Sequence, residues 1–103
     1  MALTFNNLKF RPNNADNRCI NATLELKPNI FLSVTAGPGR YSTPGGLGSD
    51  KSFDEYPDSN DFASFEIATI DENLPDDQQT WDVTGWQSRE DINNFINEFL
   101  KDE

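Results

Sequence analysis

The most constraining feature of this 103-residue chain is its last segment, SREDINNFINEFLKDE, at residues 88–103. The apolar residues of this segment recur at i, i+3, i+4, i+7 and i+8: Ile92, Phe95, Ile96, Phe99 and Leu100. This spacing confines them to an arc of roughly 140° and predicts a one-sided helix. Ser88, followed three residues later by Asp91, predicts its capped start. A helix of this kind needs another layer of structure to cover its apolar arc.

Antiparallel strands are predicted to supply that layer. Apolar and polar residues alternate over residues 20–26, and Lys27-Pro28-Asn29 then turns the chain into the apolar run at residues 30–36. This pattern predicts a hairpin. A further strand is predicted over residues 63–70, because Asp71-Glu72-Asn73 follows it as a turn signal.

The N-terminal residues 3–10 alternate in two short pieces, with the phase broken at Asn6-Asn7. This interruption predicts a first strand that carries a bulge or a tight bend. The predicted fold class is therefore α+β, a small antiparallel sheet of four to five strands with one C-terminal helix packed on a face. The length predicts a single domain over residues 1–103.

The charge of the chain is strongly acidic and unevenly distributed. The formal net charge is -10; residues 1–49 hold two acids and five bases, whereas residues 50–103 hold sixteen acids and three bases. Because like charges repel, we expect no direct binding to nucleic acid or anionic lipid. We expect a basic partner instead. The chain shows no apolar run of about 20 residues and no secretory leader, so we expect a cytoplasmic, non-membrane protein.

The connection at residues 37–61 contains five of the six glycines and is a candidate site, because long loops inside small domains are often functional. Within it, GGLGSDKS at residues 45–52 is close to a phosphate-binding loop. Asp50 occupies the position of the second glycine, and its carboxylate would repel a phosphate. We therefore expect no nucleotide binding. The sequence is compatible with an ordered loop and with a loosely packed one.

Enzymatic chemistry and cofactors are not expected. The chain has no histidine and one cysteine, Cys19, at the start of a predicted strand, so a Ser-His or Cys-His pair and a zinc site with nitrogen and sulfur ligands are excluded. Weak calcium binding by acidic loop residues stays open, although neither 58–61 nor 71–77 has the spacing of a calcium-binding loop. A small hydrolase that uses two carboxylates is a further alternative.

Aromatic residues beside acids are typical of surfaces that bind a basic partner. The predicted partner-binding residues are Tyr41, Asp54, Glu55, Tyr56, Asp58, Asp61, Glu90 and Glu98. Glu90 and Glu98 lie on the predicted outward arc of the helix, and the others lie in the long loop. In the alternative interpretation, the aromatic residues Phe53, Trp81 and Trp86 close the core beneath the loop instead.

The stretches YSTP (41–44), SFEIA (64–68) and DVTGWQSREDI (82–92), in this order, resemble small acidic proteins encoded by phages and other mobile elements, a population that includes anti-CRISPR proteins. The resemblance covers residues 30–100 and assigns no functional residues. It implies an inhibitor that occupies a protein surface or a nucleic-acid-binding groove, which an acidic face does by imitating DNA. The expected function is a non-enzymatic acidic inhibitor of a basic protein or nucleoprotein. A cytosolic interaction domain of a housekeeping complex is the main alternative.

Overall fold

The computed structural model describes residues 3–14, 16–38, 40–43, 45–46, 56, 58–75 and 83–101. Its elements, in chain order, are η1 (Phe5–Asn7), β1 (Arg11–Pro12), β2 (Ile20–Lys27), β3 (Ile30–Pro38), β4 (Gly45–Gly46), η2 (Ser59–Asp61), β5 (Phe65–Asp71), β6 (Thr84–Gln87) and α1 (Arg89–Leu100), where η denotes a 3₁₀ turn.

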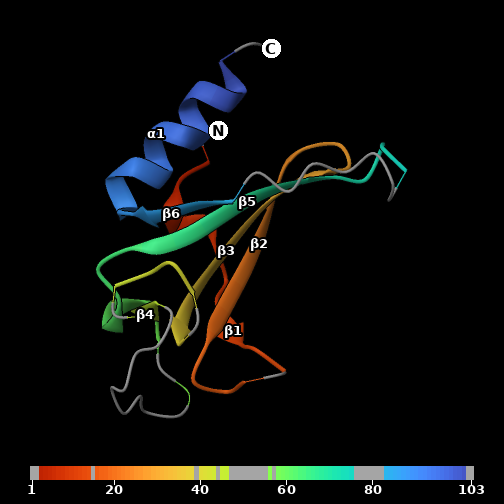
Figure 1. The fold of residues 1–103 in the computed structure, drawn as a ribbon. Coiled ribbons are helices and arrows are strands. Elements are labelled where there is room, and N and C mark those ends of the chain that lie inside the picture. The colour runs from red at the N-terminus through yellow and green to blue at the C-terminus, as the bar shows by residue number, and fades with distance from the viewer. Residues whose placement is uncertain are drawn as a thin grey trace.

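The strands form a sheet in the order β1-β2-β3-β5-β6, in which all neighbours are antiparallel. The short β4 pairs in parallel with the end of β3. The helix α1 packs at the β6 end of the sheet, and its C-terminal half extends away from the strands (Figure 1). This arrangement confirms the predicted α+β fold with an antiparallel sheet and one C-terminal helix.

The β2–β3 hairpin forms where the alternation predicts it, and Pro28 and Asn29 make its turn. Asn29 has a φ of 65°, a conformation that asparagine adopts more readily than most residues, and its N–H donates to the Glu25 carboxylate. Leu32 and Val34 on β3 are fully buried, whereas the intervening Ser33 is half-buried. One face of the hairpin is therefore core.

The prediction of a first strand over residues 3–10 is wrong. Residues 5–7 form the 3₁₀ turn η1, because the Thr4 side chain accepts from the Asn6 N–H while the Asn7 carboxamide accepts from the Thr4 N–H. Side-chain bonds of this kind compete with strand pairing. The turn places the rings of Phe5 and Phe10 5.7 Å apart, and both rings pack on Phe65 of β5.

The helix begins with the predicted capping box: the Ser88 hydroxyl accepts from the Asp91 N–H at 3.1 Å, and the Asp91 carboxylate accepts from the Ser88 N–H at 3.0 Å. Ile92 and Ile96 are fully buried. Phe95 and Phe99 are only half-buried and line an open groove of about 290 Å³ between α1 and the β5–β6 edge. The predicted apolar arc therefore has a deep centre and a shallow flank.

The first helical residue, Arg89, also joins the packing. Its guanidinium lies 5.3 Å from the ring centres of both Phe5 and Phe65, and it donates to the backbone oxygen of Ser59. Arginine stacks favourably on aromatic faces in such positions. Arg89 thus connects the helix to the N-terminal turn and to η2.

The described part of the connection at residues 37–61 is partly organised. Gly45–Gly46 pairs with Gly37 and Pro38, and Thr43 forms an isolated bridge with Ser64 just before β5. The buried Ser42 hydroxyl accepts from the Gly37 N–H at 3.1 Å. These contacts hold residues 40–43 against the sheet and fix the position of Tyr41.

Candidate functional site

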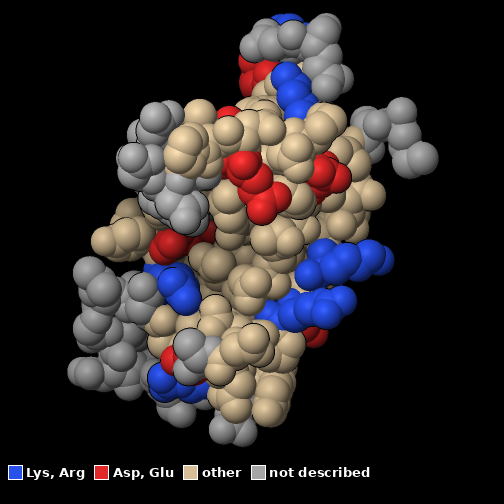
Figure 2. All heavy atoms as spheres, turned by 90° about the vertical axis from the view of Figure 1, so that its right-hand side faces the viewer, with Lys and Arg blue, Asp and Glu red and all other residues tan. Residues whose placement is uncertain are grey.

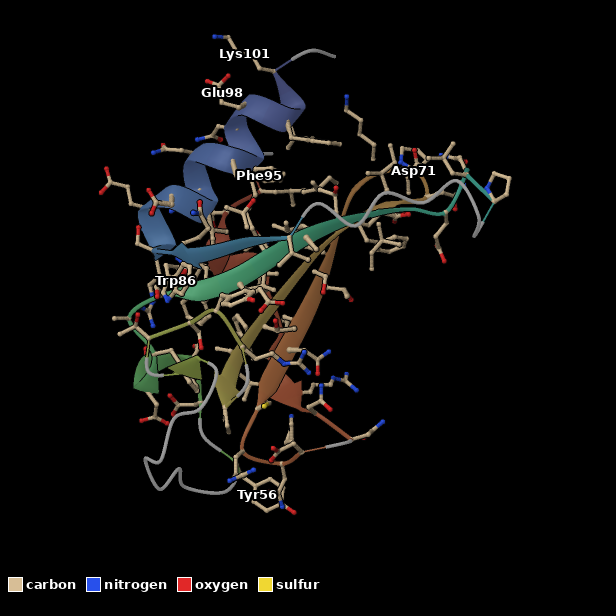
Figure 3. The ribbon with its side chains drawn as sticks, in the orientation of Figure 1. Tyr56, Asp71, Trp86, Phe95, Glu98 and Lys101 are labelled. Carbon is tan, nitrogen blue, oxygen red and sulfur yellow. The ribbon has the colours of Figure 1, made fainter. Side chains whose placement is uncertain are left out.

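The predicted partner-binding residues do not form one surface. Figure 3 shows Glu98 near the C-terminal end of α1 at the top, Trp86 at mid-height near the start of the helix, and Tyr56 at the bottom. Glu90 is exposed on the first turn of the same helix. Tyr41 packs against Trp86, so the two predicted tyrosines belong to different regions. Asp54 and Glu55 lie outside the described residues.

Asp58 and Asp61 cap the short turn η2. The Asp58 carboxylate accepts from the Asn60 N–H at 2.8 Å, and the Asp61 carboxylate accepts from the Asp58 N–H at 2.9 Å. Both residues are exposed, but these bonds give each carboxylate a local structural role. This role makes them weaker candidates for partner binding than the sequence alone implies.

Tyr56 is 65% exposed and has a φ of 56°. Its N–H donates to the Asn17 backbone oxygen at 2.8 Å, which places the tyrosine over an open, polar groove of about 590 Å³. The other residues that line this groove are Pro12, Asn13, Asn14, Asp16, Asn17 and Arg18. Asp16 and Arg18 are paired at 2.9 Å, and this charge-assisted hydrogen bond lowers the pKa of Asp16 to about 2.

Tyr41 and Trp86 form the most distinctive exposed feature of the described surface. Their ring centres lie 5.1 Å apart with a tilt of 47°, a favourable geometry for an aromatic pair. Trp86 is 58% exposed and Tyr41 is 40% exposed, so one flank of the pair faces solvent. The alternative interpretation, in which Trp86 closes the core, is therefore wrong. Phe53 and Trp81, which that interpretation also used, lie outside the described residues.

A β-bulge directs Trp86 outward. Phe65 pairs with Gln87, and Ile67 pairs with Thr84, so the β6 strand has one more residue than β5 between these two pairs. Trp86 lies in this bulge with a φ of 55°, a backbone conformation that is rare for a bulky side chain. Strain of this kind persists only where the surrounding structure enforces it, and it occurs often at functional sites.

Three contacts enforce the arrangement from the side of Tyr41. The Tyr41 backbone oxygen accepts from the Trp86 N–H at 2.8 Å, and the Tyr41 N–H donates to the Glu66 carboxylate at 2.9 Å. Gly85 lies so close that an added Cβ would be 2.5 Å from the Tyr41 Cβ. The backbone of Tyr41 is thus clamped between β5 and β6. The pair is an ordered feature of the fold rather than two loose side chains.

The described surface carries little of the net charge. The described residues include ten of the eighteen acids and seven of the eight bases, a net charge of -3. On the face shown in Figure 2, carboxylates and cations are interspersed among uncharged residues, and extended cationic side chains project from its right-hand edge. Most of the acidic excess belongs to residues 47–55, 76–82 and 102–103, which are not described.

The described residues show no cluster of metal-ligating side chains and one buried thiol. They include no group of three or more ligands that could hold a metal ion. Cys19 is buried, and burial raises the pKa of its thiol, which contacts the Pro38 backbone oxygen at 3.4 Å. This cysteine packs as the small apolar residue that its position predicts. In the same part of the chain, no helix is long and apolar enough to cross a membrane.

Comparison with known proteins adds no further assignment. No family model matches the chain, and no curated protein or solved structure is significantly similar to it.

Proposed function

We propose that this protein is a non-enzymatic binding protein that engages a basic surface of a protein or nucleoprotein, with Tyr41 and Trp86 as its anchor. The observation that carries this proposal is the exposed Trp86, held in a strained backbone conformation against Tyr41. Tryptophan and tyrosine are enriched among the residues that dominate binding energy. Because the pair is already ordered, little conformational entropy is lost when a partner covers it.

The acidity of the chain complements this anchor. A net charge of -10 creates a negative field that speeds encounter with a surface rich in lysine and arginine. Glu90 and Glu98, both exposed on α1, contribute to this field from the described part of the molecule. In this proposal the carboxylates govern the association rate, whereas the aromatic pair governs how long the complex lasts.

The biological role that fits these properties is inhibition of a nucleic-acid-binding protein in the cytoplasm. The support is the resemblance to acidic proteins of phages and mobile elements, together with a charge that suits a groove built for nucleic acid. Residues 50–103 carry thirteen excess negative charges. Duplex DNA carries one charge per ~1.7 Å of axis, so these charges equal those of roughly six or seven base pairs. Such an inhibitor competes directly with the natural ligand of its target.

The test begins with affinity capture from host lysate by the wild-type protein and by a Tyr41→Ala/Trp86→Ala variant. We expect a basic partner that the wild-type protein retains and the variant loses. Leu74→Ala is the matched control, because Leu74 is also an exposed apolar residue but lies in the connection after β5. Competition with labelled DNA or RNA for the recovered partner then tests inhibition.

Association rates of the recovered partner test the electrostatic part. We expect them to fall between about 0.1 M and about 1 M salt, over which the Debye length shortens from about 10 Å to about 3 Å. Glu90→Lys and Glu98→Lys should slow association further. An acidic partner, or rates that neither salt nor charge reversal changes, would contradict the proposal. A partner that is bound without loss of its nucleic-acid affinity would favour the housekeeping alternative.

A further inference from the structure

We propose that Tyr41, Trp86 and Glu66 form a recognition site for an arginine side chain of the partner. This inference rests on the proposed function and names the chemical group that its aromatic anchor binds. The site combines two exposed aromatic rings, 5.1 Å apart, with a carboxylate on the adjacent strand. An arginine guanidinium is planar, always charged and weakly hydrated, so it stacks on aromatic faces while it donates to carboxylates.

Strand pairing brings the carboxylate to the aromatic pair. The β-bulge places Gly85 and Trp86 of β6 beside the stretch of β5 that contains Glu66. The Glu66 Oε2 atom accepts from the Tyr41 N–H at 2.9 Å, so the carboxylate lies at the backbone of the residue whose ring contacts Trp86. The other oxygen, Oε1, accepts no hydrogen bond from the residues that the structure describes. It is therefore an acceptor for an incoming N–H donor.

Among the described residues, the cation–π contacts are made by Lys27 and Arg89 on phenylalanine rings, and none is made on Tyr41 or Trp86. Arg40 precedes Tyr41, and its charge offsets part of the rise in the pKa of the Cys19 thiol that burial causes. Arg89 follows Trp86 by three residues, and its guanidinium lies over the rings of Phe5 and Phe65. In the described part of the chain, the aromatic pair thus has no cation of its own. The packing of Arg89 on two rings at 5.3 Å is the same interaction, made within the fold.

Arginine suits this site better than lysine for a geometric reason. The Trp86 flank offers a flat apolar surface, and Glu66 offers an acceptor at one side of the clamped Tyr41 backbone. A guanidinium can stack on the ring and still direct N–H groups sideways to an acceptor, whereas a lysine ammonium is a compact and strongly hydrated charge. The negative charge of the chain attracts arginine and lysine alike. A difference in affinity between the two therefore measures the contribution of the site itself.

The experiment measures binding of hexa-arginine and hexa-lysine peptides to the full chain by calorimetry at low salt. We expect hexa-arginine to bind about tenfold more tightly, which corresponds to one desolvated cation–π contact. Trp86→Ala should remove this preference and leave hexa-lysine binding almost unchanged. Glu66→Gln should reduce the preference while the carboxamide oxygen still accepts from the Tyr41 N–H. Tyr56→Ala, which removes the other exposed tyrosine, should change neither affinity.

The outcomes separate this inference from the proposed function. Equal affinity for the two peptides, or an arginine preference that survives in Trp86→Ala and Glu66→Gln, would overturn the arginine site. Salt-sensitive binding of both peptides in that case would leave the proposal of a basic partner intact. The absence of hexa-arginine binding would also overturn the site. Glu66→Gln and Trp86→Ala each alter one partly exposed side chain, so we expect both variants to keep the fold. The chemical shifts of the backbone amides in NMR spectra of the wild-type protein and the variants check this expectation.

Discussion

Gly85→Ala tests the clamp that holds the aromatic pair. The added Cβ would lie 2.5 Å from the Tyr41 Cβ and 3.3 Å from both Tyr41 Cγ and the Tyr41 backbone oxygen. Ordinary contacts between carbon atoms are about 3.5–4.0 Å, so Tyr41 must retreat by about 1 Å. Its backbone cannot do so freely, because the N–H is bonded to Glu66 and the oxygen accepts from Trp86.

The expected cost is a loss of about 1–4 kcal/mol in the free energy of unfolding. Overpacking in a well-ordered site costs about 1–3 kcal/mol, and each weakened hydrogen bond adds about 1 kcal/mol. Alanine also restricts the unfolded chain more than glycine, which opposes the loss by about 0.4–1 kcal/mol. Urea denaturation measures the net change, and NMR shifts of the Trp86 indole N–H report whether the ring has moved.

A double-mutant cycle identifies the contact that is responsible. The nearest atom is the Tyr41 Cβ, so Tyr41→Gly should relieve most of the cost of Gly85→Ala, whereas Tyr41→Ala, which keeps the Cβ, should relieve less. If Gly85→Ala changed neither the stability nor the Trp86 indole shift, the close approach of β6 to Tyr41 would be refuted. The pre-organised site would then be refuted with it.

Further predictions concern the helix and the ion pair. Ile96→Ala should lower the free energy of unfolding by about 2–5 kcal/mol, because Ile96 is fully buried. Phe99→Ala should cost less than the usual loss of about 3–5 kcal/mol, because the Phe99 ring lines an open groove. Urea denaturation measures both losses, and equal losses for the two variants would contradict this prediction. Ser88→Ala should cost about 1 kcal/mol by loss of the helix cap, and no change in thermal denaturation would show that the cap is dispensable. Hydrogen bonds from Arg18 lower the pKa of Asp16 from the ordinary value of 3.8 to about 2, so the ion pair stabilises the fold above about pH 4 and its contribution is lost as pH falls from about 4 to about 2. An NMR titration should place the midpoint of Asp16 near 2, and Asp16→Asn should remove this part of the acid-induced loss; a midpoint near 3.8 would mean that the pair does not form in solution.

Local signals in the sequence predict the helix and the hairpin. The helix start depends on Ser88 and Asp91, which lie three residues apart, and the hairpin turn depends on adjacent Pro28 and Asn29. Each is stabilised by contacts within a few residues, so the pattern contains the information needed to predict it. The prediction of an N-terminal strand is wrong for a related reason. The side chains of Thr4 and Asn7 form hydrogen bonds with the local backbone, and this preference overrides the apolar alternation.

The sequence also identifies part of the candidate site. It indicates Tyr41 as an exposed aromatic residue beside acids, and the structure places Tyr41 at the surface. The sequence does not indicate that the Trp86 ring packs against Tyr41 or that the Glu66 carboxylate accepts from the Tyr41 N–H. Tyr41, Glu66 and Trp86 come from three segments that lie far apart along the chain. The one available signal is Gly85 directly before Trp86, since glycine inside a strand pattern often marks a bulge or a close approach of another backbone.

Only the tertiary structure decides which aromatic residues are core and which are exposed. Phe65 and Trp86 both lie on strands at the β5–β6 pairing, yet Phe65 is fully buried and Trp86 is 58% exposed. The difference arises from the bulge, which is a property of the pairing between two strands and not of either strand alone. The same holds for the helix, where Ile96 reaches the core, whereas Phe95 and Phe99, on the flank of the same apolar arc, line an open groove. Amino-acid type and spacing thus determined the helix, the β2–β3 hairpin and β5, whereas strand register and the placement of the helix determined the surface that they present.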